Sequence, residues 1–201
     1  MIYLASRSPR RRELLAQIGV RYEPLLFREG ARADPDTDES VQPRESPDEY
    51  VRRVTRMKAE AAWKRVTLRR GLARKPALVA DTTVALGEEI FGKPADPPDA
   101  RRMLAALSGR SHRVLTAVGV QLEARFEMAV SETIVTFAPL DDARIAAYVA
   151  TGEPFDKAGA YGIQGRAGAF ASRLEGSYTG VMGLPLYETA QLLRLFGVTV
   201  P

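Results

Sequence analysis

The chain has 201 residues, of which 45% are hydrophobic and 27% charged, as in a globular protein with one sizeable core or two lobes. It has no cysteine and one histidine, which excludes disulfides, thiol catalysis and multi-histidine metal sites. A hard cation held by carboxylates stays compatible with this composition. The net charge of +4 favours acidic ligands. Without a run of about 18 apolar residues or a signal-peptide pattern, we expect a cytoplasmic protein that does not enter membranes.

The N-terminal segment combines a short apolar run with a basic helix start. Residues 2–5 predict a buried strand, and residues 9–18 predict a helix capped by Ser8 with Pro9 at its first position. Arg10, Arg11 and Arg12 then oppose the positive end of the helix dipole. An anion opposite them, phosphate above all, would account for this placement. A solvated basic turn, a localisation signal or a nucleic-acid contact are the alternatives.

The next elements are a polar loop and a long helix. Residues 28–47 form a loop that is long for a compact domain and carries several acidic residues, so we expect it to be mobile or functional. Ser46 and Glu49 predict a capping box, followed by a helix that places Lys58 on one face. The acidic residues of the loop include Asp34, Asp36, Asp38 and Glu39.

The middle of the chain predicts strands paired with turns. The apolar run 77–80 predicts a buried strand that continues to Leu86 and returns as residues 90–91 after a turn. A helix capped by Asp96 follows. Alternation over residues 114–122 predicts a half-buried strand, which we expect to pair antiparallel with residues 127–137.

The C-terminal third predicts a helix over 140–150, a glycine-rich segment over 153–183 and a closing helix over 187–196. Helices mixed with hairpins predict a mixed α/β fold around a twisted sheet. No break in composition divides the chain, so we expect a single domain over residues 1–201.

Asp81 is the first candidate for chemistry. It follows the apolar run 77–80, and carboxylates at strand ends commonly hold metals or activate water. An Asp that only accepts hydrogen bonds from the following turn is the alternative. Lys93 comes just after the predicted hairpin and could return to the end of the sheet where Asp81 lies, although a solvated lysine is the ordinary interpretation.

The segment 156–165 is the second candidate. Its glycines allow close approach of the main chain, and Gln164 can donate and accept together, as reading a base edge requires. An irregular loop is the alternative. His112 begins a strand, where a structural role is favoured over catalysis. The P-loop and GxGxxG motifs are absent, which argues against P-loop nucleotide hydrolases and Rossmann cofactor sites.

Taken together, these motifs resemble the Maf family of nucleoside triphosphate pyrophosphatases. The resemblance covers essentially the whole chain, with the pieces in family order. Arg10-Arg11, Thr82 and Tyr161 to Gln164 resemble the branch that acts on dTTP and UTP, and not the branch resembling 7-methyl-GTP pyrophosphatases. The matching pieces are Leu4 to Leu15, Ala80 to Thr82, Gly92 to Asp96, Leu107 to Gly109, Asp156 to Gly165 and Gly183 to Pro185.

The resemblance implies a role for each matched residue. Asp81 matches the proton acceptor, although it could instead be a metal ligand. Glu39 aligns with an acidic position that helps to hold metal. Arg11, Thr82 and Gln164 match positions tied to substrate selection. The polar positions that line the phosphate cleft are Ser6, Arg10, Lys58 and Lys93.

The same resemblance implies a two-lobed α/β fold around a central cleft, similar to inosine triphosphatase, often as a homodimer. The implied reaction is metal-assisted attack of water on the α-phosphorus of dTTP or UTP, with Mg²⁺, Mn²⁺ or Co²⁺ as cofactor. It would clean nucleotide pools and bear on cell-division arrest. The rivals are an inosine-triphosphate-type purine pyrophosphatase and a non-enzymatic module that binds nucleic acid or regulates the septum. The small charge excess and 7% aromatic content argue against nucleic acid as a partner.

Overall fold

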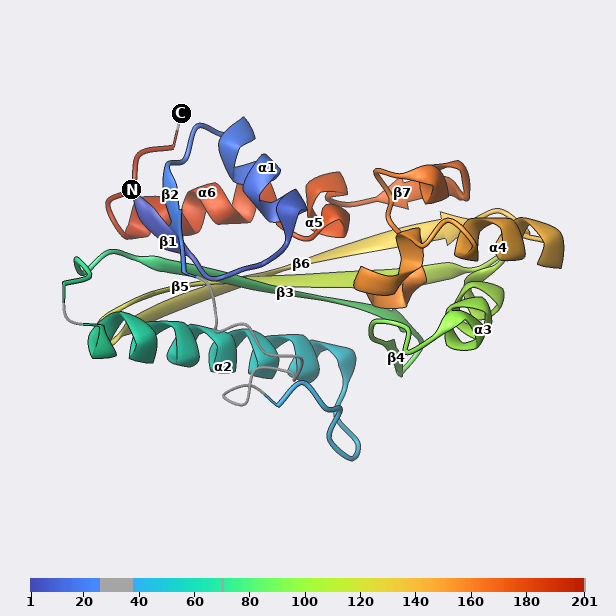
Figure 1. Cartoon of the computed structure of the whole chain (residues 1–201), viewed down its shortest axis with the longest axis horizontal. Helices are drawn as coiled ribbons and strands as arrows, with labels where there is room; N and C mark the ends of the chain where they lie inside the picture. Colours follow the sequence, from blue (N-terminus) through green and yellow to red (C-terminus); the bar gives the residue numbers. More distant parts are fainter. Residues whose placement is uncertain (26–37, 70, 201) are drawn as a thin grey trace.

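One mixed sheet forms the centre of the fold in the computed structural model, which describes residues 1–25, 38–69 and 71–200 (Figure 1). Within these residues the strand order is β2-β1-β3-β5-β6-β7, with β4 paired to β3. β1 runs parallel to β2 and β3, and all other pairs are antiparallel. The strands are β1 (Ile2–Leu4), β2 (Tyr22–Pro24), β3 (Ala77–Leu86), β4 (Glu89–Phe91), β5 (Ser111–Leu122), β6 (Arg125–Phe137) and β7 (Ala171–Glu175).

The predicted helix starts are confirmed by their caps. Ser8 accepts from the backbone N–H of Arg11, and Ser46 and Glu49 form a reciprocal capping box. Asp96 caps the third helix. The helices are α1 (Pro9–Gln17), α2 (Pro47–Leu68), α3 (Pro97–Leu107), α4 (Asp142–Val149), α5 (Tyr178–Met182) and α6 (Leu186–Leu195), with 3₁₀ turns at Glu153–Asp156, Ala158–Ala160 and Arg166–Ala169.

Helices cover both faces of the sheet. Figure 1 shows α2 along one face and α1, α5 and α6 on the other. Separate apolar cores lie toward the two ends of the long strands: one joins Phe91 to Leu104 of α3 and Tyr148 of α4, and the other joins Leu4 to Leu193 of α6. These two cores correspond to the two expected lobes, and two smaller clusters lie between the sheet and α2.

The structure corrects the sequence-based description of β5 (Ser111–Leu122). This strand was expected to be half-buried, but nearly every residue from Val114 to Val120 is buried, because β3 and β6 flank it and helices cover both faces. The intervening residues are themselves apolar or small, so the alternation that predicted a solvent face was misleading. β2, β7 and α5 were not predicted.

Asp81 lies in the middle of β3. Its position after the apolar run 77–80 had indicated a strand end, which the structure corrects. On one edge of β3, β1 pairs only with Ala77 and Leu78, and β4 pairs only with residues 84–86. Within the described residues no strand pairs with 79–83 on this edge. We call this stretch the edge gap of β3. It lies just beyond the C-terminal end of β1, where ligands commonly bind in sheets with parallel strands.

His112 has a structural place, as the sequence favoured. It is buried, its Nε2 lies 2.9 Å from the Tyr161 hydroxyl, and its ring packs edge-on against Phe137. Burial lowers the pKa of His112 from 6.5 to about 4. The folded protein therefore keeps this imidazole neutral at pH values where the unfolded chain protonates it.

We predict that this burial makes the protein less stable in mild acid. As pH falls from about 6.5 to 4, the unfolded state binds a proton that the folded state refuses, which removes about 3 kcal/mol of unfolding free energy. Denaturant unfolding of the wild type and His112→Gln at pH 7.5 and pH 5 measures this. The wild type should lose more stability than the variant on acidification, and an equal loss in both would contradict the prediction.

Candidate active site

At the edge gap of β3, adjacent residues contact helices on opposite faces of the sheet. Asp81 and Thr82 are consecutive strand residues, so their side chains point to opposite faces. Asp81 points to the α2 face, where it contacts Lys58. Thr82 points to the other face, where it contacts Arg11 of α1. A ligand entering the gap could therefore meet groups from α1 and from α2.

On the α2 side, two carboxylates converge on one ammonium group. The Nζ of Lys58 lies 2.6 Å from an oxygen of Asp81 and 2.9 Å from an oxygen of Glu39. Burial alone would favour the neutral amine, but the charges of Asp81 and Glu39 outweigh it and raise the pKa of Lys58. Lys58 is therefore a fixed cation, and Glu39 reaches it from the segment before α2.

The pKa of Glu39 shows which charges surround it. Burial raises this pKa, but the charge and hydrogen bond of Lys58, followed by the charges of Lys93 and Arg11, bring it below its ordinary value. Lys93 lies in the turn after β4, and Arg11 lies on α1. Cations from three separate elements thus act on this one carboxylate.

On the α1 side, the guanidinium of Arg11 is held by three acceptors. Its Nε donates to the Gly183 carbonyl at 2.7 Å, and its two terminal nitrogens donate to the hydroxyls of Ser6 at 3.3 Å and Thr82 at 3.4 Å. Gly183 ends α5 at φ +111°, a conformation that favours glycine, and so brings its carbonyl to Arg11. Burial lowers the pKa of Arg11, and the charge of Asp81 opposes this. An arginine stays charged nonetheless.

Behind Thr82, a buried hydroxyl supports its position. The Thr116 hydroxyl has one hydrogen, which it donates to the Gly180 carbonyl at 2.8 Å, so it accepts from the Thr82 hydroxyl at 3.0 Å. The Thr82 hydroxyl therefore donates its hydrogen to Thr116 and accepts from Arg11, which uses one of its two lone pairs. What Thr82 can still offer a ligand is its second lone pair.

The glycine-rich segment forms a third side of the site. Arg10 of α1 pairs with Asp156 at 3.0 Å across 146 positions of sequence, and this ties the segment to the N-terminal turn. Gly159 donates to the Gly92 carbonyl at 3.0 Å beside Lys93. A Cβ on Gly159 would lie 2.9 Å from Val84, and its φ of +68° also favours glycine.

The described residues contain no cluster of three or more His, Cys, Asp or Glu side chains that could hold a metal alone. Asp81 and Glu39 nevertheless share a cation, the Lys58 ammonium. Two carboxylates facing one position fit a hard divalent ion whose remaining ligands are water and phosphate oxygens.

Comparison with known proteins places the chain in a family. The model described as Maf-like protein matches residues 1–196. The chain belongs to the Maf family. Curated relatives cover almost the whole chain: a protein of Cupriavidus metallidurans is 57% identical over 98% of both chains, and one of Chromobacterium violaceum is 55% identical over 100% of this chain and 96% of that protein. Both are named dTTP/UTP pyrophosphatase.

A solved structure shares the fold of this Maf protein. The Ham1 protein of Staphylococcus aureus superposes with a TM-score of 0.50 over 97% of this chain and 96% of that chain, at 13% identity. This confirms the expected mixed α/β architecture. No helix among the described residues is long and apolar enough to cross a membrane.

The structure brings most of the predicted site residues into direct contact. Glu39, Lys58 and Asp81 form one cluster on the α2 side, and Lys93 acts on it through its charge. Gln164 is exposed on the segment that Arg10 ties down through Asp156. The second cluster, on the α1 side, consists of Ser6, Arg11 and Thr82.

Two of the acidic loop residues named from the sequence, Asp34 and Asp36, lie outside the described residues. The sequence missed Thr116, for which the one signal was a hydroxyl amid the apolar positions of a buried strand. It also assigned no role to Tyr50 or Arg53 of α2.

Proposed function

We propose that this chain hydrolyses dTTP and UTP to the nucleoside monophosphate and pyrophosphate. The observation that carries the proposal is the shared gap: cations of α1 and α2 act on Asp81, and these two cations and Lys93 of the turn after β4 act on its neighbour Glu39. Such an arrangement suits a triphosphate, whose charge must be offset while one carboxylate stays beside the reacting phosphorus. The names of the curated relatives support the choice of dTTP and UTP.

In the proposed reaction, water attacks the α-phosphorus and the bond from that phosphorus to the β-bridging oxygen breaks. Asp81 accepts the proton of the water, and pyrophosphate leaves with the bond electrons. Lys58 and Arg11 offset charge on the phosphate oxygens from the two faces of the sheet. Arg10 and Lys93 do so from the rim, because the guanidinium fork and the ammonium both bind phosphate.

Asp81 and Glu39 are the residues that would hold a divalent cation, Mg²⁺, Mn²⁺ or Co²⁺. When bound, such an ion offsets charge on the triphosphate and on the leaving pyrophosphate. The chain's own contribution is the placement of the two carboxylates. The Nζ of Lys58 holds them near each other, at 2.6 Å from Asp81 and 2.9 Å from Glu39.

Selection of a pyrimidine falls to Arg11, Thr82 and Gln164. Thr82 has a lone pair with which to accept a hydrogen bond, because its hydrogen goes to Thr116 and its other lone pair accepts from Arg11. Gln164 offers both an amide donor and a carbonyl acceptor from an exposed position. These groups are complementary to the mixed donor and acceptor edge of a uracil or thymine.

A panel of nucleotides and metals tests the proposal. We expect pyrophosphate release from dTTP and UTP to exceed that from CTP and GTP, and to stop when a chelator removes the divalent ion. Preference for purines would favour the inosine-triphosphate-type rival, and a flat nucleotide profile would refute selection by Gln164 and Thr82. Nucleic-acid affinity that falls steeply with salt, without hydrolysis, would favour the binding module.

Five expectations from the sequence about domain organisation, assembly, location and cellular role stay predictions. These are the single domain over residues 1–201, the homodimer, the cytoplasmic location, the role in cleaning nucleotide pools and the link to cell-division arrest.

A further inference from the structure

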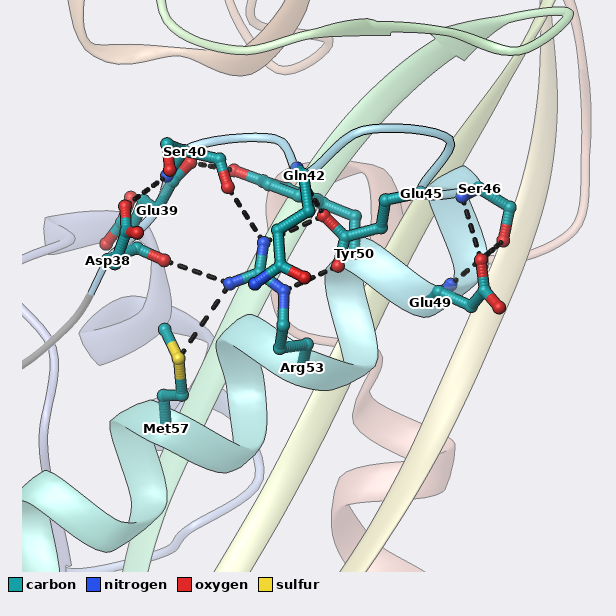
Figure 2. A network of polar contacts seen from close by, with 10 residues as sticks. All are labelled: Asp38, Glu39, Ser40, Gln42, Glu45, Ser46, Glu49, Tyr50, Arg53 and Met57. Atoms are coloured by element: carbon teal, nitrogen blue, oxygen red, sulfur yellow. Dashed lines mark hydrogen bonds and ion pairs between the residues drawn. The ribbon is translucent and has the colours of Figure 1, made fainter.

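The segment that delivers Glu39 to the site is fastened to the start of α2. Residues 38–45, which we call the strap, precede α2 and fold back over its first turns (Figure 2). Figure 2 shows side chains of α2 pointing into the strap. Glu39, the acidic partner of Lys58, is the second residue of this strap.

Three consecutive backbone carbonyls of the strap accept hydrogen bonds from two side chains of α2. Arg53 donates to the carbonyl of Asp38 at 3.0 Å and to that of Ser40 at 2.8 Å. Tyr50 donates its hydroxyl to the carbonyl of Glu39 at 3.0 Å. The carbonyl of Glu39 and those on either side of it are thus all held, so the backbone from which its carboxylate extends is fixed on both sides.

Arg53 is itself oriented by a carboxylate of the strap. Both oxygens of Glu45 accept from its guanidinium, one from Nη2 at 2.8 Å and the other from Nε. The Glu45 side chain is 7% exposed and that of Arg53 is 19% exposed, so the pair is shielded from water. The guanidinium is planar, so fixing one of its edges against Glu45 also fixes the directions of its remaining N–H donors. These donors point at the backbone carbonyls of Asp38 and Ser40 in the strap.

This arrangement is not needed to start the helix. Ser46 and Glu49 already satisfy the first turn of α2 with a capping box. The bonds of Arg53 and Tyr50 instead go to the residues that surround Glu39. The same helix carries Lys58, so α2 holds both the backbone of Glu39 and the ammonium that its carboxylate meets at 2.9 Å.

We propose that Arg53, with Tyr50, is a positioning residue for the reaction: it fixes the strap so that the Glu39 carboxylate stays beside Lys58 and Asp81. This inference rests on the proposed function of the site. Arg53 acts through Glu39 and touches neither substrate nor metal. Its removal should therefore cost no more than the removal of the Glu39 carboxylate itself.

A double-mutant cycle measures whether Arg53 acts through Glu39. The variants are Arg53→Met, which removes the fork and keeps an unbranched chain, Glu39→Gln, and the two combined. We expect each single variant to lower kcat/KM for dTTP at least ~10-fold, and the double variant to be no worse than Glu39→Gln alone. Effects that multiply in the double variant, or a larger loss in Arg53→Met than in Glu39→Gln, would overturn the proposal.

Amide hydrogen exchange gives a readout that needs no turnover. Residues 38–45 should exchange faster in Arg53→Met than in the wild type, and at the wild-type rate in Glu39→Gln and in the control Arg52→Met. Arg52 lies next to Arg53 on α2, but its side chain is 51% exposed and its contact with Asp48 is 3.9 Å long. Unchanged exchange in Arg53→Met would overturn the proposal.

Two further measurements keep the result interpretable. If Arg53→Met fails to fold, Arg53→Lys replaces it, since a lysine keeps the charge but cannot make the fork, and the same cycle and exchange criteria apply. A wild-type protein that releases no pyrophosphate would defeat the proposed function. The exchange result would still report whether Arg53 holds the strap.

Discussion

Asp81→Asn is expected to lower turnover of dTTP by ~10²–10⁴-fold and to leave the protein folded. Asparagine has the size of aspartate, and its carbonyl oxygen can still accept from Lys58, which lies 2.6 Å from Asp81. It cannot take a proton from water, and it brings no negative charge to share a divalent ion with Glu39. Steady-state pyrophosphate release measures the rate, and thermal unfolding measures the fold.

The control for this variant is Asp142→Asn, which removes an exposed carboxylate from the first turn of α4 and should keep wild-type activity. The dependence on divalent ion separates the two roles left open for Asp81. A base lost from the site lowers kcat at every concentration of Mg²⁺, whereas a lost metal ligand is partly compensated by more Mg²⁺. Pyrophosphate release at the wild-type rate would exclude Asp81 from either role.

Local signals in the sequence were enough for the helix starts. Ser8, Ser46 and Asp96 each accept the backbone hydrogen bond that their cap positions predict, because capping depends on residues three positions apart. The hairpin of β3 and β4 was predicted for the same reason. The burial of β5 was harder to predict from the sequence, because helices that pack against the sheet determine whether one or both of its faces are covered.

The site was predicted as a set of residues but not as a geometry. Asp81 was expected at a strand end, and what opens β3 beside it is the separation of its two neighbours, β1 and β4, which no local pattern encodes. The contact of Glu39 with Lys58 and the hold of Arg53 on the strap join residues 13 to 19 positions apart through a turn. The position of residues 38–45 thus depends on contacts with side chains of α2, which no local sequence pattern reports.

Lys58→Met is expected to weaken both activity and stability. Activity should fall on the order of 10²-fold, because a fixed cation facing the triphosphate is lost. Stability at pH 7 should fall by roughly 1–3 kcal/mol, since Asp81 and Glu39 are left facing each other without their shared ammonium. This is less than for fully buried pairs, because the Glu39 side chain is 45% exposed.

The pH dependence identifies the cause of that instability. Glu39 has a lowered pKa in the wild type, so its contribution is present above the ordinary value of 4.5 and is lost as pH falls through the folded pKa. Lys58 has a raised pKa, so its contribution is present below 10.5 and is lost as pH rises through the folded value. The stability difference between wild type and variant should therefore be largest near neutral pH and close toward acid and strong alkali.

Denaturant unfolding at pH 4, 7 and 11 measures this difference, with Lys64→Met as the control because Lys64 is an exposed lysine of the same helix. Lys64→Met should retain wild-type turnover. A stability loss in Lys58→Met that stays constant with pH would mean that its alkyl chain, and not its charge, matters. Wild-type turnover in Lys58→Met would remove this lysine from the phosphate-binding groups, leaving Arg11 as the cation that meets the triphosphate inside the edge gap of β3.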